Sequence, residues 1–192
     1  MTGPRRGVYP GSFDPPTVAH LAIARRALEV HTLERVVLAV SEVALDKGQP
    51  SRPRFEDRLR VLRAEVETHG WLEVIVTTHQ LVADIAAGYD VVIMGADKWE
   101  QIHDPRYYAD TASMTRALAS LPPPAIAPRA GISVPAGFLL DVPAAVSHVS
   151  STSARAGALD SMSAAARRFN RLTGAWTDAA RYDQWVDDQT SR

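Results

Sequence analysis

The stretch "VYPGSFDPPTVAH", residues 8–20, decides the fold, because an apolar run passes through a proline-rich turn into a helical pattern. The run before Pro10 suits a short strand that ends at Pro10 and Gly11. After the turn, apolar residues recur at spacings of three, three and four, which predicts an amphipathic helix. These residues are Val18, Leu21, Ala24 and Leu28.

The same alternation continues along the chain. Apolar runs predict further strands, and segments with helical periodicity lie between them. We expect strands at 7–9, 35–40, 72–78 and 90–95, and helices over 18–28, 55–66 and 82–87. A strand–helix alternation of this kind predicts an α/β fold, a Rossmann-like doubly wound parallel sheet with helices on both faces. Ligands of such sheets bind beyond the carboxyl ends of the strands, at the switch point.

The later part of the chain has a less regular pattern. "AIAPR" at 125–129 and "FLLDV" at 138–142 are predicted as late strands. Residues 1–160 are predicted to form the α/β domain, and residues 161–192 a helical extension packed on it and ending in a polar tail.

Composition limits the classes of function. With 192 residues, of which 46% are hydrophobic and 22% charged, the chain can bury a full core as a globular protein. The net charge of −1 gives no basic field for a nucleic acid polymer or a membrane surface. The absence of cysteine excludes disulfides and thiol nucleophiles. No signal sequence or membrane-spanning run is evident, so we expect a cytoplasmic protein.

The turn after the first strand carries groups suited to phosphate. Gly11 is expected to adopt torsions closed to other residues and to let the backbone approach a ligand. The following helix presents unpaired N–H groups and the positive end of its dipole. Thr17 and His20 are three residues apart and so share one face of its first turn. The alternative is that Thr17 only caps the helix and His20 lies on its surface.

A second hydroxyl-rich segment lies late in the chain. "SSTSAR", residues 150–155, places Ser150, Ser151 and Thr152 at the start of a helix and Arg155 one turn later. Hydroxyls and a guanidinium form an anion-binding arrangement, although the segment alone is also typical of an ordinary capped helix. Two such segments at one edge of a sheet would suit a polyphosphate.

With both segments in hand, the chain resembles the nucleotidylyltransferase superfamily of α/β phosphodiesterases. The family loop Gly-x-Phe-x-Pro-x-(His/Thr)-x-Gly-His is similar to "GSFDPPTVAH" at 11–20, and the late Ser-Ser-Thr-x-x-Arg to "SSTSAR". The resemblance covers roughly residues 6–160. "LLDVP" and "GAD" at 95–97 look most like bacterial nicotinate or nicotinamide mononucleotide adenylyltransferases, whereas the early loop looks like phosphopantetheine adenylyltransferase.

The resemblance implies a reaction and a set of residues. A phosphate oxygen of a small acceptor attacks the α-phosphorus of a nucleoside triphosphate, ATP or alternatively CTP, and pyrophosphate leaves. It implies that Mg²⁺ is carried by the triphosphate and not by a protein site. The catalytic residues implied are His20, Thr17, Lys47 and Arg155. The nucleotide-binding residues implied are Gly11, Ser12, Phe13, Thr17, His20, Gly95, Asp97, Ser150, Ser151, Thr152 and Arg155. The acceptor-binding residues implied are Ser12, Lys47, Arg58 and Trp99.

Several of these positions allow a second interpretation. Lys47 lies in a polar loop, where most lysines are simply solvated. Trp99 could stack on a nicotinamide ring or could pack over the sheet edge. Ala19 replaces the family glycine before the histidine and puts substrate identity in doubt. Asp97 stands where pantetheine enzymes carry arginine, which disfavours a pantetheine acceptor.

Three functions remain open at this point. The first is adenylyl transfer to nicotinate or nicotinamide mononucleotide. The second is a cytidylyltransferase or other nucleotidylyltransferase that activates a small phosphate or phosphonate. The third is a non-catalytic nucleotide-binding protein, against which His20 and Arg155 argue. A dehydrogenase is excluded because no Gly-x-Gly-x-x-Gly follows the first strand. The sequence leaves the oligomeric state open, a homo-oligomer included.

Overall fold

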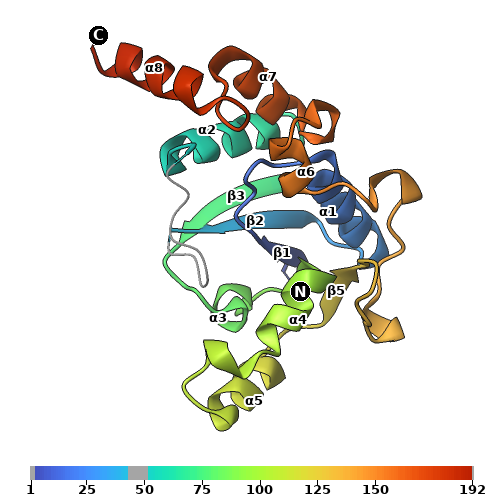
Figure 1. Ribbon diagram of the computed structural model, residues 1–192. Helices are drawn as coiled ribbons and strands as arrows, with labels where there is room; N and C mark the ends of the chain where they lie inside the picture. The colour runs from blue at the N-terminus through green and yellow to red at the C-terminus, as the bar shows by residue number, and fades with distance from the viewer. Residues whose placement is uncertain (1–2, 43–51, 192) are drawn as a thin grey trace.

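The computed structural model describes residues 3–42 and 52–191, and its centre is a parallel sheet (Figure 1). Within these residues, five strands lie in the order β3-β2-β1-β4-β5, and every pairing is parallel. The chain therefore reverses its direction of travel across the sheet between β1 and β4, which is the switch point of a doubly wound fold. The predicted α/β class is confirmed. The strands are β1 (Arg6–Pro10), β2 (Arg35–Ser41), β3 (Leu72–Thr77), β4 (Val91–Gly95) and β5 (Pro124–Ala127).

Helices cover both faces of the sheet. The first strands are joined by α1 (Val18–Val30), α2 (Phe55–Val66) and α3 (Val82–Ala86). After β4 come α4 (Ala96–Ile102) and α5 (Thr111–Ala119), and after β5 come α6 (Ser151–Arg155), α7 (Ala164–Thr173) and α8 (Ala179–Thr190). Short 3₁₀ turns lie at Pro105–Tyr107, Ala136–Phe138, Ala144–Val146 and Leu159–Ser161.

The strand pleat divides the core into two layers. Neighbouring residues of one strand point to opposite faces, so Tyr9 and Leu38 pack with α1 and α2 in one cluster. Val8 and Ala39 pack with α3, α4 and α5 in the other. Both faces of the central strands are therefore buried, which explains why "RVVLAV" reads as a nearly continuous apolar run.

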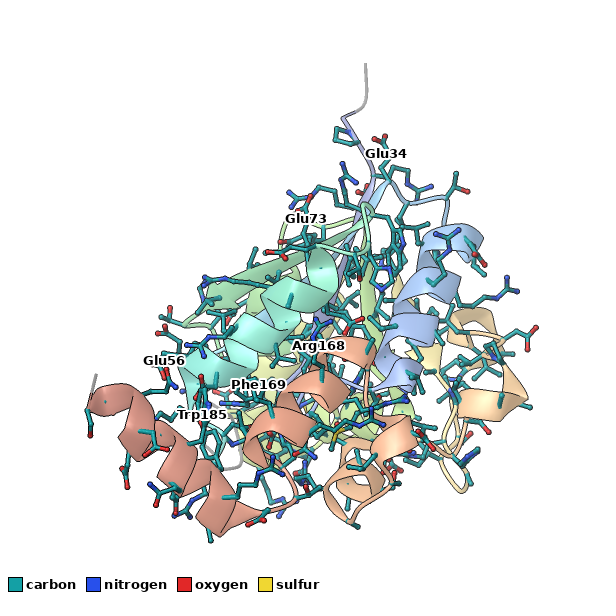
Figure 2. The ribbon with its side chains drawn as sticks, turned by 90° about the horizontal axis from the view of Figure 1, so that it is seen from above. Glu34, Glu56, Glu73, Arg168, Phe169 and Trp185 are labelled. Atoms are coloured by element: carbon teal, nitrogen blue, oxygen red, sulfur yellow. The ribbon has the colours of Figure 1, made fainter. Side chains whose placement is uncertain are left out.

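The C-terminal helices form a third layer. α7 packs mainly on α2, which lies between the C-terminal helices and the sheet (Figure 1). Phe169 of α7 and Trp185 of α8 meet edge to face at 5.4 Å between ring centroids, and Figure 2 labels both. The extension thus contacts the sheet largely through α2. The predicted boundary at residue 160 stays a prediction.

One predicted strand is wrong. Residues 138–142 form no strand and contribute only a parallel bridge between Leu139 and Ile126. The ladder cannot extend far, because β5 ends at Ala127 and Pro128 has no N–H to donate to a neighbouring strand. Within the part of the chain described here, no helix is both long and apolar enough to cross a membrane.

The hydroxyl of Tyr182 fastens α8 to α2. It donates to Oδ2 of Asp57 at 2.5 Å and accepts from the backbone N–H of Arg54 at 2.9 Å. Burial, with a smaller contribution from the bond to Asp57, raises the pKa of Tyr182 to about 12. The hydroxyl therefore stays protonated and keeps both bonds throughout the neutral range.

Tyr182→Phe should lower the free energy of unfolding by about 1–3 kcal/mol, because it leaves a buried carboxylate oxygen and a backbone N–H without this partner. Urea unfolding followed by circular dichroism measures the change. Tyr89→Phe is the matched control, since the structure assigns the Tyr89 hydroxyl no hydrogen bond among the described residues. Equal stability of wild type and Tyr182→Phe would contradict the role of the hydroxyl.

Candidate active site

An open pocket of about 820 Å³ lies beyond the carboxyl ends of the strands, at the switch point. Its walls come from the loop after β1, the starts of α1 and α4, Pro128 and Arg129 after β5, and α6. Of the predicted site residues, the pocket brings together Gly11, Ser12, Phe13, Thr17, His20, Arg58, Gly95, Asp97, Ser150, Ser151, Thr152 and Arg155. Its volume is typical of a small-molecule site.

The loop after β1 is shaped by a buried phenylalanine. Phe13 adopts a left-handed backbone with φ of 45°, and its side chain is 2% exposed beneath Gly11. A Cβ at Gly11 would lie 2.9 Å from Cζ of Phe13. Gly11 itself is not left-handed, so the expectation about its torsions is corrected: space above the Phe13 ring requires the glycine.

Thr17 and His20 form a reciprocal cap at the start of α1. The backbone N–H of Thr17 donates to Nδ1 of His20 at 3.0 Å, and the N–H of His20 donates to Oγ1 of Thr17 at 3.3 Å. Oγ1 also lies 2.9 Å from Nδ1, and Thr17 is only 1% exposed. The Thr17 hydroxyl is thus occupied with His20, as in the capping interpretation, and it orients the imidazole.

These bonds determine what His20 can do. Because Nδ1 accepts from a backbone N–H, the hydrogen of a neutral ring must be on Nε2. The ring lies against Tyr9 and Phe13, with centroids at 6.0 and 5.1 Å. Burial among them lowers the pKa of His20 to about 4. At neutral pH the side chain is therefore an uncharged N–H donor at the pocket wall.

The late hydroxyl-rich segment joins the first loop directly. Ser150 caps α6 through Ser153, whose N–H donates to Oγ of Ser150 at 3.0 Å. Ser151 donates from Oγ to the carbonyl of Pro15 at 2.8 Å. Two of the three hydroxyls predicted to bind a ligand therefore form hydrogen bonds within the protein. The sequence of this segment alone is the same for either role.

Arg155 links the same two segments while lining the pocket. Its guanidinium donates to the carbonyl of Asp14, and its Nη2 donates to Oγ1 of Thr152 at 3.3 Å. Nη1 also lies 3.7 Å from Oδ2 of Asp14. The two predicted anion-binding segments thus meet at Asp14 and Arg155.

The opposite wall is formed by the ends of β4 and β5. Gly95 precedes α4, and Asp97 pairs with Nε of Arg129 through Oδ2 at 3.0 Å. The sequence analysis does not predict Arg129 as a site residue, although it ends the predicted strand at 125–129, and the rule that ligands bind at the carboxyl ends of strands could have found it. The pocket also includes the cationic residues Lys98 and Arg106.

Three predicted acceptor residues have different outcomes. Arg58 is 2% exposed and donates from Nη1 to the carbonyl of Ser12 at 3.4 Å, so it supports the loop from below. Trp99 is outside the pocket lining and packs against His103 and Phe138, with centroids at 4.3 and 5.8 Å. Trp99 therefore matches the packing alternative and not the ring-stacking role. Lys47 lies outside the described residues.

We expect the ring of His20 to remain neutral at pH 6, with its hydrogen on Nε2. Nitrogen-15 NMR of the ring would show this, and the His20→Ala spectrum would assign the signals. A pKa near the ordinary value of 6.5 would contradict it. Because the pKa is lowered on folding, this group's contribution to stability is complete above pH 6.5 and decreases as the pH falls toward 4.

Known proteins with similar sequences identify the family of this chain. The family model described as cytidylyltransferase-like matches residues 8–157, which include both walls of the pocket. A phosphopantetheine adenylyltransferase of Frankia alni is 32% identical over 122 residues, covering 61% of this chain and 70% of the relative. One of Cereibacter sphaeroides is 33% identical, covering 59% and 68%.

A third relative has a different name. The probable nicotinate-nucleotide adenylyltransferase of Roseobacter denitrificans is 33% identical over 124 residues, covering 57% of this chain and 60% of the relative. The match of the family model to most of the chain and the relatives from two named groups point to one reaction class. The chain belongs to the cytidylyltransferase-like family and is a nucleotidyltransferase.

Proposed function

We propose that the protein transfers the adenylyl group of ATP to a small phosphate-bearing acceptor and releases pyrophosphate. An acceptor phosphate oxygen forms a bond to the α-phosphorus, and the bond from that phosphorus to the bridging β-phosphate oxygen breaks. The observation that carries this proposal is that His20, whose neutral ring keeps its hydrogen on Nε2, lines the same pocket as Arg155. The names of the relatives in two groups support adenylyl transfer.

His20 is suited to stabilising the negative charge that develops on phosphate oxygens in the transition state. Negative charge accumulates on phosphate oxygens in the transition state, and a preoriented N–H donor stabilises it without reorganising. A neutral imidazole keeps its Nε2 hydrogen at neutral pH, so it donates a hydrogen bond and does not transfer a proton. Thr17 acts through His20 by holding Nδ1.

The triphosphate would lie against α6. Arg155 supplies paired guanidinium donors for β- and γ-phosphate oxygens, with the N–H groups of Ser151 and Thr152 beside it. Gly11 and Ser12 offer backbone close to the phosphates, and Gly95 and Asp97 form the opposite wall toward the nucleoside. Lys47 remains a proposed second cation.

Three aspartates of the pocket lining already have an arginine partner, which favours Mg²⁺ held by substrate oxygens. Asp14, Asp97 and Asp104 each pair with an arginine. Among residues 3–42 and 52–191, no group of three or more His, Asp or Glu side chains is placed to hold a metal ion. Mg²⁺ bound to the triphosphate would neutralise part of its charge, while the protein supplies hydrogen bonds and orientation.

For the acceptor we propose nicotinate or nicotinamide mononucleotide. Asp97 in the "GAD" segment and the relative from Roseobacter denitrificans support this choice. Trp99 gives it no support, because its ring packs away from the pocket. Phosphopantetheine is the second candidate, since relatives such as that of Frankia alni carry its name.

Incubating the protein with Mg²⁺, ATP or CTP, and each acceptor tests this proposal through pyrophosphate release. Turnover should appear with ATP and a mononucleotide, and His20→Ala should lower kcat about 10²- to 10³-fold with a smaller change in affinity for ATP. No turnover above His20→Ala with any acceptor would overturn the enzymatic proposal. Turnover with phosphopantetheine alone would replace the proposed acceptor.

Arg155→Ala should weaken Mg·ATP binding about 10- to 100-fold, because a hydrogen-bonded charge partner of the phosphates is lost. Isothermal titration calorimetry without acceptor measures the affinity. Arg168→Ala, which removes an exposed arginine of α7 (Figure 2), is the matched control and should bind like the wild type. Unchanged affinity in Arg155→Ala would remove α6 from the proposed triphosphate site.

A further inference from the structure

The turn between α7 and α8 carries Trp176, and the side chain of Asn170 organises its backbone. Gly174 ends α7 with φ of 76°, and a Cβ there would lie 2.9 Å from the carbonyl oxygen of Asp178. The buried side chain of Asn170 then accepts the N–H of Trp176 through Oδ1 at 2.8 Å and donates from Nδ2 to Oγ1 of Thr177 at 2.9 Å. Both bonds fix the backbone on which the indole is carried.

From this turn the indole reaches the loop after β1. Nε1 of Trp176 donates to Oδ1 of Asp14 at 2.7 Å, and the two residues are 7% and 8% exposed. The other oxygen of the same carboxylate faces Nη1 of Arg155 at 3.7 Å, and Arg155 also donates to the carbonyl of Asp14. One chain of contacts therefore runs from Trp176 through Asp14 to the arginine that lines the pocket.

We infer that Trp176 is a positioning residue for triphosphate binding, which it serves by fixing the Asp14 carboxylate that orients Arg155. The inference rests on the proposed function, in which Arg155 binds phosphates. Trp176 lies beyond residues 8–157, so this support comes from a part of the chain outside the family match.

The indole N–H is what the position requires. A phenyl ring at position 176 could fill the same packing role, since the indole meets Phe169 edge to face with 6.0 Å between ring centroids. A buried carboxylate oxygen, however, needs a hydrogen-bond donor. Without the indole N–H, the folded state would be less stable unless the Asp14 side chain turned toward another donor. Such a turn would move Oδ2 of Asp14, the carboxylate oxygen that pairs with Nη1 of Arg155 at 3.7 Å.

Trp176→Phe removes this donor and leaves an aromatic ring in place. We expect the Kd of Mg·ATP, measured by calorimetry without acceptor, to rise about three- to tenfold, as for other positioning contacts. Trp185→Phe is the matched control: it removes an indole from the same apolar cluster, where the ring packs on Phe169 and Tyr182. Equal Kd values for Trp176→Phe and Trp185→Phe would overturn the inference.

A double-mutant cycle separates positioning from general weakening of the fold. If Trp176 acts through Arg155, Trp176→Phe should not change the Kd further in an Arg155→Ala background. If both substitutions contribute fully and independently to the Kd, the indole does not act through Arg155, and the inference fails. In the wild-type background, KM for ATP should rise more than kcat falls.

A measurement on the unmodified protein keeps the inference testable if Trp176→Phe does not fold. Trp71→Phe, Trp99→Phe and Trp185→Phe assign the Trp176 indole N–H resonance by elimination, because the chain has four tryptophans. Mg·ATP should shift the Trp176 resonance more than the Trp185 resonance, and a Trp176 signal that Mg·ATP leaves unmoved would contradict the coupling. Both readouts use binding alone, so the absence of pyrophosphate release would count against the proposed reaction and not against this contact.

Discussion

The hydrogen bond from the Thr17 backbone N–H to Nδ1 of His20 is the interaction on which the pocket depends. The first N–H groups of a helix lack partners within it, and this bond with its reciprocal partner satisfies two of them in the first turn of α1. The same bond leaves the hydrogen of the neutral ring on Nε2. A requirement of helix formation thereby sets the tautomer of the side chain that we propose as the donor to phosphate.

The aromatic base beneath the loop completes this arrangement. Phe13 lies under Gly11, and the rings of Phe13 and Tyr9 contact the imidazole of His20. A charged imidazole would therefore lose hydration by water. The lowered pKa of His20 follows from that burial. The neutral ring of His20 and the guanidinium of Arg155 thus line one pocket. In the proposed function His20 would bind a phosphate through a directed hydrogen bond, and Arg155 through its charge.

Much of the fold could be predicted because it depends on local patterns. The strand–helix alternation and the crossover rule predicted the parallel sheet, and the rule that ligands bind at the carboxyl ends of strands predicted the edge at which Gly11 and Gly95 line one pocket. The prediction of a strand at 138–142 is wrong because Pro128, which has no N–H, interrupts the ladder that this apolar run would join. The interpretation of the Ser150 and Ser151 hydroxyls was incomplete, because a capping hydroxyl and a ligand hydroxyl have the same local sequence.

The sequence by itself determined the turn in "VYPGSFDPPTVAH" and the helix that follows, and it placed Thr17 and His20 on one face of the first turn of that helix. These features are local, and residues three or four apart fix them through hydrogen bonds and torsions. Only the tertiary structure decided that Trp99 packs away from the pocket, that Arg129 pairs with Asp97, and that Trp176 donates to Asp14. Such contacts join distant segments, and their partners are chosen by the packing of helices on the sheet rather than by any spacing along the chain.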